Sequence, residues 1–216
     1  MIILINYLRD QVKDGKFEIT FMVPKDIRYN YGNGRILYYA QDTVTGEEGV
    51  GRFEDFVVGG TSTVEIMDTI GPDLQLYLNN PAFANGGKTY ESPRFYAKIY
   101  DESGINTVGS GIGHDLLLII DNDPENMHVL NDYFSTQNNS YQQGSVSYKI
   151  PEMTVGAHSL TFRAWDLLNN SSTATMDFQV VKGLDPTIYQ VLSYPNPVAC
   201  NGVLNFRIEC DQPEGV

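Results

Sequence analysis

The chain has 216 residues, of which 42% are hydrophobic, and its formal net charge at pH 7 is −13. This hydrophobic fraction excludes wholesale disorder and suits one large domain or two small ones. The acidic balance argues against nucleic-acid binding, which needs basic patches for phosphate. No apolar run approaches the roughly 18 residues that a membrane-spanning helix needs. We therefore expect neither a nucleic-acid partner nor a membrane span.

The first predicted unit comprises residues 1–62. Apolar and polar residues alternate in it, with Phe17, Ile19, Phe21 and Val23 on one face of a predicted strand at 16–23. Further strands are predicted at 2–9, 35–41 and 50–58. A sandwich of so few strands is marginal. We expect upstream residues to complete this unit, or the next unit to support it.

The second predicted unit, residues 63–182, has the pattern of an Ig-like β-sandwich. Strict alternation at 94–101, 158–166 and 174–181 predicts half-buried strands, and the apolar run 116–120 predicts a central strand. Clusters of Asn, Gly, Pro and Asp separate these segments and are typical of turns. The predicted fold class is all-β, with tandem sandwich units of which the larger is Ig-like.

The third predicted unit, residues 183–216, is a linker followed by the first strand of a truncated sandwich. Tyr-Pro-Asn-Pro-Val at 194–198 leads into an alternating strand that ends at Cys210. The two prolines fix the backbone and withhold two donors, so they predict a boundary between sandwiches. On one extended strand, Cys200 and Cys210 would lie roughly 33 Å apart, too far for a disulfide. Two free or buried thiols are expected.

No catalytic residue is predicted in this chain. It lacks a Gly-x-Ser-x-Gly motif and a cysteine motif with flanking glycines. Its histidines, His114, His128 and His158, lie in a different unit from the cysteines, and no pair of them has the spacing of a zinc site. We therefore expect this chain not to be an enzyme by itself.

Two weaker site predictions remain open. Asp121, Asp123 and Glu125 place oxygen ligands at alternating positions, which suits calcium, but Asp, Asn and Pro are also ordinary turn residues, and a solvated turn is favoured. Calcium is thus the only cofactor considered. Trp165 and Arg163 fall on the polar side of their strand and could bind a glycan or a peptide, although cover by a neighbouring loop or domain is favoured.

Several motifs, taken in order, resemble the region after the catalytic domain in gingipain-like cysteine peptidases. The resemblance is greatest to the type IX (Por-type) secretion sortases of Bacteroidetes. It covers nearly the whole chain, and Gly-Ile-Gly-His-Asp at 111–115 and Tyr-Pro-Asn-Pro-Val at 194–198 belong to it. The other segments that carry it are 14–27, 31–40, 92–106, 130–134 and 156–172.

This resemblance implies a parent cysteine peptidase whose catalytic His and Cys precede residue 1. The parent would cleave cargo signals and attach cargo to an anionic lipopolysaccharide, and this chain would be its non-catalytic Ig-like spacer. The implied partners are the upstream peptidase domain and secretion components of the outer membrane, at a periplasmic or cell-surface location. Asp-Thr-apolar motifs also imply O-glycan acceptors at Thr43 and Thr69. A glycan- or adhesin-type binding module is the alternative function.

Overall fold

The computed structural model describes residues 11–25, 31–60, 62–63, 66–108, 113–137, 140–184 and 188–210. The strand predicted at 2–9 lies outside these ranges. The described residues form an all-β protein whose one helical element is the short 3-10 helix η1 (Asn131–Tyr133). None of them belongs to a helix that is long and apolar enough to cross a membrane.

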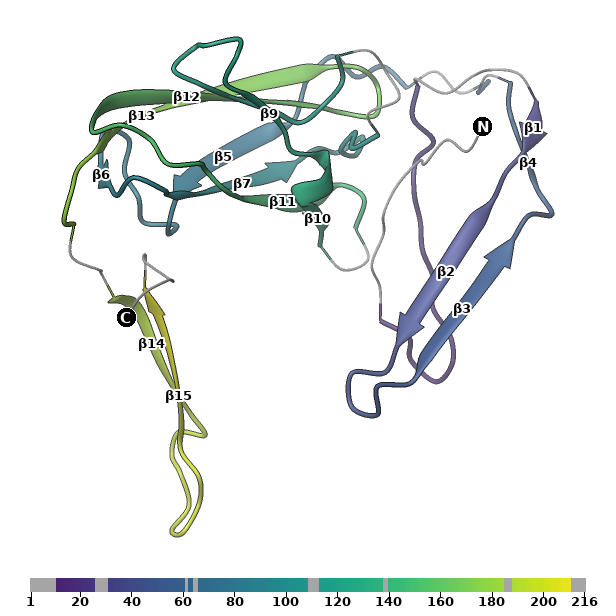
Figure 1. The fold of residues 1–216 in the computed structure, drawn as a ribbon. Helices are drawn as coiled ribbons and strands as arrows, with labels where there is room; N and C mark the ends of the chain where they lie inside the picture. Colours follow the sequence, from purple (N-terminus) through teal and green to yellow (C-terminus); the bar gives the residue numbers. More distant parts are fainter. Residues whose placement is uncertain are drawn as a thin grey trace.

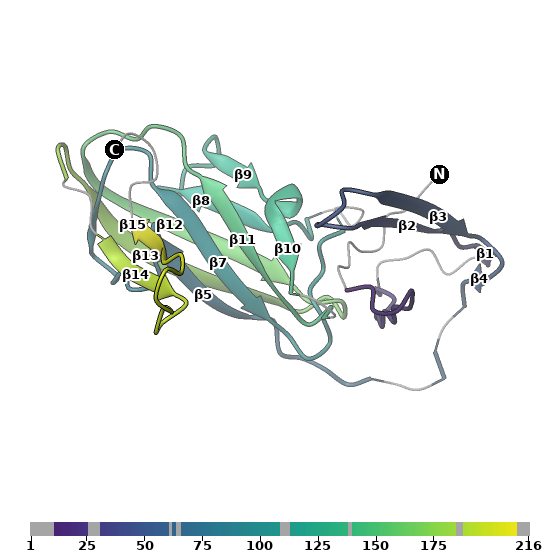
Figure 2. The same cartoon turned by 90° about the horizontal axis from the view of Figure 1, so that it is seen from below.

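The central part of the chain is a sandwich of two sheets (Figures 1 and 2). The first sheet has the order β10-β11-β7-β5, and its strands are β5 (Asp73–Leu78), β7 (Arg94–Tyr100), β10 (Phe134–Thr136) and β11 (Gln143–Lys149). The second sheet has the order β6-β13-β12-β8-β9. Its strands are β6 (Lys88–Thr89), β8 (Leu117–Ile120), β9 (Met127–Val129), β12 (Gly156–Trp165) and β13 (Ser171–Val180).

The core lies between these sheets and follows the predicted alternation. On β12, Leu160, Phe162 and Ala164 are fully buried, whereas the residues between them are partly exposed. Strand β7 buries Phe95, Ala97 and Ile99 in the same way. The rings of Phe95 and Phe162 meet across the sandwich with their centroids 5.3 Å apart. The hydrophobic pattern of each strand therefore decides which face it turns inward.

The N-terminal part forms two small ladders beside the sandwich (Figure 2). Strand β1 (Gly32–Asn33) pairs with β4 (Val57–Val58), and β2 (Ile36–Gln41) pairs with β3 (Glu48–Phe53). The strand predicted at 16–23 is wrong: apart from an isolated bridge between Lys16 and Lys13, this segment pairs with no strand of the described residues, and Phe17 and Val23 are 47% and 42% exposed. An alternating pattern needs a neighbouring strand edge to become a strand, and the described residues offer none here.

The C-terminal part is a hairpin that extends away from the sandwich (Figure 1). Strand β14 (Ile188–Tyr194) pairs antiparallel with β15 (Asn205–Cys210). The predicted boundary at the prolines is therefore wrong, because Pro195 and Pro197 lie in the connection between two paired strands. The strand at the end of the chain likewise has a partner that precedes it. The predicted domain limits at 62/63 and 182/183 fall between the strand groups, but independent folding of each group stays a prediction.

Candidate functional site

A buried acidic cluster lies at the end of the sandwich nearest the N-terminal part. Asp101 follows β7, Asp166 follows β12, and Asp68 belongs to the segment that leads into β5. Asp166 is 0% exposed and Asp101 is 6% exposed. One carboxylate oxygen from each of the three residues lies within 4.8 Å of the others. Three segments distant in sequence thus bring acidic groups together at one point.

Short hydrogen bonds hold each carboxylate in place. Asp166 Oδ1 accepts from the amides of Leu168 (2.9 Å) and Asn170 (2.7 Å), and its Oδ2 accepts from Asn170 Nδ2 (2.7 Å). Asp101 Oδ1 accepts from the amide of Ser103 at 2.7 Å. The hydroxyl of Ser103 donates to Asp68 Oδ2. The cluster is therefore a fixed arrangement of oxygen atoms.

The loop that follows β12 also connects the sandwich to segments that precede it in the chain. Asn170 Nδ2 donates to the carbonyl of Asp68 at 3.1 Å, and the amide of Lys25 donates to the carbonyl of Leu167 at 2.9 Å. A Cβ at Gly71 would lie 2.5 Å from the backbone of Ser171, so only glycine allows this close approach. The loop after β12 is thus the junction between the sandwich and the residues that precede it.

The surroundings of the cluster shift the pKa values of Asp101 and Asp68 in opposite directions. Burial, followed by repulsion from Asp166 and Asp68, raises the pKa of Asp101 to about 6. The hydroxyl of Ser103 and the amide of Ile70 lower the pKa of Asp68. Asp68 therefore keeps its charge while Asp101 takes up a proton near pH 6. Carboxylate oxygens in this arrangement could hold a hard cation.

The predicted calcium residues lie elsewhere, in the turn between β8 and β9. Asp121 accepts from the amide of Ser159 (2.9 Å) and contacts the ring of His158 (2.8 Å), and Asp123 Oδ1 accepts from the amide of Glu125 (2.9 Å). Among the described residues, the acidic groups that gather closely enough to share an ion are those of the Asp101 cluster and not these. Calcium at Asp121, Asp123 and Glu125 stays a prediction.

Trp165 is partly covered by its neighbours. The ring of His114 lies 4.3 Å from its ring centroid, and the guanidinium of Arg163 lies 5.7 Å from it. Arg163 also donates to the carbonyl of Gly113 at 3.4 Å. Trp165 Nε1 and Arg163 Nε are buried, and the described part of the chain gives neither an acceptor. The structure thus brings the two predicted binding residues together on one face of β12.

Both predicted glycosylation threonines are exposed, and they share a local geometry. The amide two residues after each aspartate donates to it: Val44 to Asp42 at 2.7 Å, and Ile70 to Asp68 at 2.9 Å. Thr43 and Thr69 are the central residues of these two turns, so both face solvent. Modification of these hydroxyls stays a prediction.

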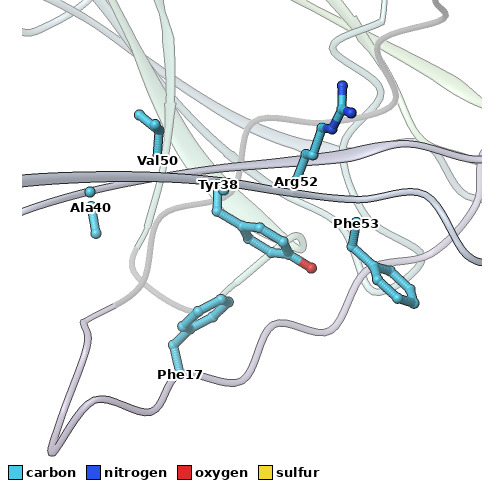
Figure 3. Close-up of a pocket in the computed structure, with 8 residues that line it drawn as sticks. Phe17, Tyr38, Ala40, Val50, Arg52 and Phe53 are labelled. Atoms are coloured by element: carbon cyan, nitrogen blue, oxygen red, sulfur yellow. The ribbon is translucent and has the colours of Figure 1, made fainter.

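The structure also contains an apolar hollow on the β2–β3 ladder (Figure 3). The sequence did not predict this hollow. The rings of Phe17 and Tyr38 contact each other there at a tilt of 60° with centroids 5.4 Å apart, and Phe53 lies beside them. Ala40, Gly49 and Gly51 also line the hollow and have at most one side-chain carbon each. The alternation of β2 was visible in the sequence, but the register that sets Gly51 opposite Tyr38 was not.

The described part of the chain is thus an all-β protein built around a sandwich with an acidic junction at one end. No protein-family model matches it, and no curated protein sequence matches it. It is similar to a solved structure, dimeric latent PorU from Porphyromonas gingivalis, with 34% identity and a TM-score of 0.57. The match covers 94% of this chain and 19% of the PorU chain, so this chain spans about a fifth of PorU. This similarity supports the resemblance to type IX secretion sortases.

Proposed function

We propose that this chain is the non-catalytic, Ig-like spacer region of a gingipain-like type IX secretion sortase. The observation that carries the proposal is the similarity to PorU over 94% of the chain at 34% identity. On this proposal the sandwich positions an upstream cysteine peptidase domain against secretion components at the outer membrane. The chain would then work in the periplasm or at the cell surface of a member of the Bacteroidetes.

The junction at the end of the sandwich supports a spacer role. In the loop after β12, the carbonyl of Leu167 accepts from the amide of Lys25 and the side chain of Asn170 donates to the carbonyl of Asp68, which couples the sandwich to the residues before it. Hydrogen bonds of this kind fix the sandwich against the preceding residues, and they need no reactive side chain. The β14–β15 hairpin, with Phe206 and Ile208 more than half exposed, provides apolar surface for the next part of a longer chain.

Peptide hydrolysis tests the proposal directly. The 216-residue chain and its longer parent are assayed on a gingipain-type peptide, and cleavage is expected from the parent alone. A double variant, Cys200→Ala with Cys210→Ala, is the control and leaves the activity of the parent unchanged. Cleavage by the short chain that this double variant abolishes would refute the non-catalytic role.

A second test addresses the spacer role in cells. Phe162→Ala removes a buried ring from the sandwich and leaves the upstream domain untouched. In the parent, we expect this variant to keep peptide cleavage but to lose attachment of cargo at the cell surface. Normal attachment by a variant whose sandwich is shown to be unfolded would contradict the proposal.

A glycan-binding module is the second candidate, and the partly exposed ring of Trp165 on β12 favours it because a sugar could stack on it. Trp165 Nε1 and Arg163 Nε are buried without an acceptor among the described residues, so donation to a sugar hydroxyl would first require their cover to move. A glycan array with the wild type, Trp165→Phe and Trp165→Ala distinguishes donation by Nε1 from stacking on the ring. Equal array signals for all three proteins would exclude Trp165 as a glycan contact.

A further inference from the structure

Three asparagines of the chain directly precede a glycine, namely Asn33, Asn85 and Asn201. Asparagine is a chemically labile residue, and glycine, which has no side chain, leaves its own backbone nitrogen free to approach the preceding side chain. That nitrogen can attack the side-chain carbonyl carbon of the asparagine. All three asparagines are exposed to solvent, so the hydrogen bonds around them decide which one reacts.

Asn85 is fixed to a strand of the sandwich through both of its reacting groups. Its Oδ1 accepts from the amide of Asp177 on β13 at 2.8 Å, and the amide of Gly86 donates to the carbonyl of Asp177 at 2.7 Å. Asp177 itself pairs with Ser159 in the ladder between β12 and β13. Both hydrogen bonds to a paired strand must therefore break before the glycine nitrogen can attack.

Asn33 is held in a similar way in the N-terminal part. It lies on β1 and pairs with Val57 on β4, and the amide of Gly34 donates to the carbonyl of Phe56 at 3.0 Å. The ring of Phe56 also covers Gly34, since a Cβ added to this glycine would collide with it. The attacking nitrogen is thus bonded to a segment distant in sequence and shielded by an aromatic ring.

Asn201 lies in the loop between β14 and β15, where the restraint is only local. Its φ is 63°, and the amide of Gly202 donates to the carbonyl of Ala199 at 2.9 Å, three residues earlier in the same turn. Such a turn opens without separating any pair of strands. Exposed loops of this kind open at the lowest cost in free energy. The glycine nitrogen is therefore released more often here than at the other two positions.

We propose that Asn201 is the site at which this protein deamidates spontaneously, through a cyclic imide formed with Gly202. Hydroxide removes the proton of the Gly202 amide, and the nitrogen forms a bond to Cγ of Asn201. The bond from Cγ to Nδ2 breaks, and the side-chain nitrogen leaves as ammonia after taking a proton from water, which regenerates the hydroxide. A water molecule then opens the ring at either carbonyl, and the product is an aspartate or an isoaspartate.

The modification changes the loop and leaves the hairpin in place. Each modified chain carries one more negative charge, and an isoaspartate adds one methylene group to the main chain. The ladder starts beyond the turn, where Tyr194 pairs with Asn205 and the Asn205 side chain donates to the carbonyl of Tyr194 at 3.3 Å. Strands β14 and β15 therefore stay paired, and modified and unmodified chains coexist in one folded preparation.

Peptide mapping of the folded 216-residue chain tests this proposal. The protein is incubated in mildly alkaline buffer, and mass spectrometry with electron-transfer fragmentation measures aspartate and isoaspartate at the three positions. We expect Asn201 to convert at least about tenfold faster than Asn33 or Asn85, because the other two must first lose hydrogen bonds to distant segments. Conversion of Asn33 or Asn85 as fast as that of Asn201 would overturn the proposal.

The same chain in urea is the matched control, since urea removes the fold and keeps the sequence. The three positions should then convert at similar rates. If Asn201 led by the same factor in urea, its neighbours in sequence and not the fold would select it, and the structural argument would be refuted.

Two variants provide an independent readout by anion exchange, which separates the more acidic modified chain. Asn201→Gln should abolish this acidic species, because glutamine would have to form a larger ring and reacts much more slowly. Asn33→Gln should leave the acidic species unchanged. Persistence of the acidic species in Asn201→Gln, or its loss in Asn33→Gln, would contradict the assignment.

Discussion

Replacing Asp101 by Asn should stabilise the sandwich at neutral pH. The side chain is 6% exposed and lies within 4.8 Å of two other carboxylates. Asn keeps the oxygen that accepts from the amide of Ser103, and its NH2 group can donate to Asp166 or Asp68. The variant therefore removes a buried charge and keeps the fold of the turn.

The magnitude follows from the raised pKa. A shift from 3.8 to about 6 corresponds to about 3 kcal/mol of unfavourable charging. Coulomb repulsion at this spacing gives a similar value, roughly 3 kcal/mol for one pair in a medium of dielectric constant about 20. Solvent at the partly exposed Asp68 screens the cluster, so we expect a gain of about 2 kcal/mol.

The sign of the pH dependence makes the prediction specific. Because the folded pKa of Asp101 is raised, the contribution of this residue to wild-type stability is fully present below about pH 4 and falls as the pH rises through about 6. Urea unfolding in chelator, followed by Trp165 fluorescence, should show Asp101→Asn more stable at about pH 7.5 and equal to the wild type near pH 4. Asp73→Asn, an exposed change on β5, is the control. A gain that does not vary with pH would refute the reasoning.

Four further outcomes are expected. Phe162→Ala should cost about 3–5 kcal/mol of unfolding free energy in urea melts, whereas Phe206→Ala, at a position 65% exposed, should cost little. Asn79→Ala should be less stable than Asn79→Gly by about 1 kcal/mol, since both lose the bonds to Thr89 and Arg94 but only glycine accepts the φ of 63°. Mass spectrometry after alkylation should show two labelled thiols without reduction, with Cys200 faster than Cys210 because it is more exposed. A solvated turn at 121–125 should give equal melting temperatures in calcium and in chelator; a rise in calcium that Asp123→Asn abolishes would show a bound ion instead.

The sandwich could be predicted because apolar and polar residues alternate along its strands. Leu160, Phe162 and Ala164 alternate with polar residues, and the structure buries these three. The segment with Phe17 and Val23 carries the same signal but forms no strand. Alternation records which face is apolar and not whether a partner strand is present. Pairing depends on the rest of the chain, so the same pattern gave one correct and one wrong prediction.

The acidic cluster could not be predicted because its members are far apart in the chain. Asp68, Asp101 and Asp166 meet only after β7 and β12 pack in opposite sheets, and each looks like an ordinary turn residue in its own segment. The predicted calcium residues at 121–125 are visible in the sequence because they are close together in the chain. The Asp101 cluster forms only through the fold, so local spacing does not reveal it.

The two-stranded hairpin has a consequence for handling the purified protein. Within the described residues, β14 and β15 each pair only with one another, so each leaves one edge of backbone donors and acceptors unused. Val191, Phe206 and Ile208 lie on one face of the hairpin and are more than half exposed. Open edges beside apolar side chains are templates for intermolecular pairing and aggregation. The substitution Phe206→Lys would oppose intermolecular strand pairing during concentration or crystallisation without disturbing the sandwich core.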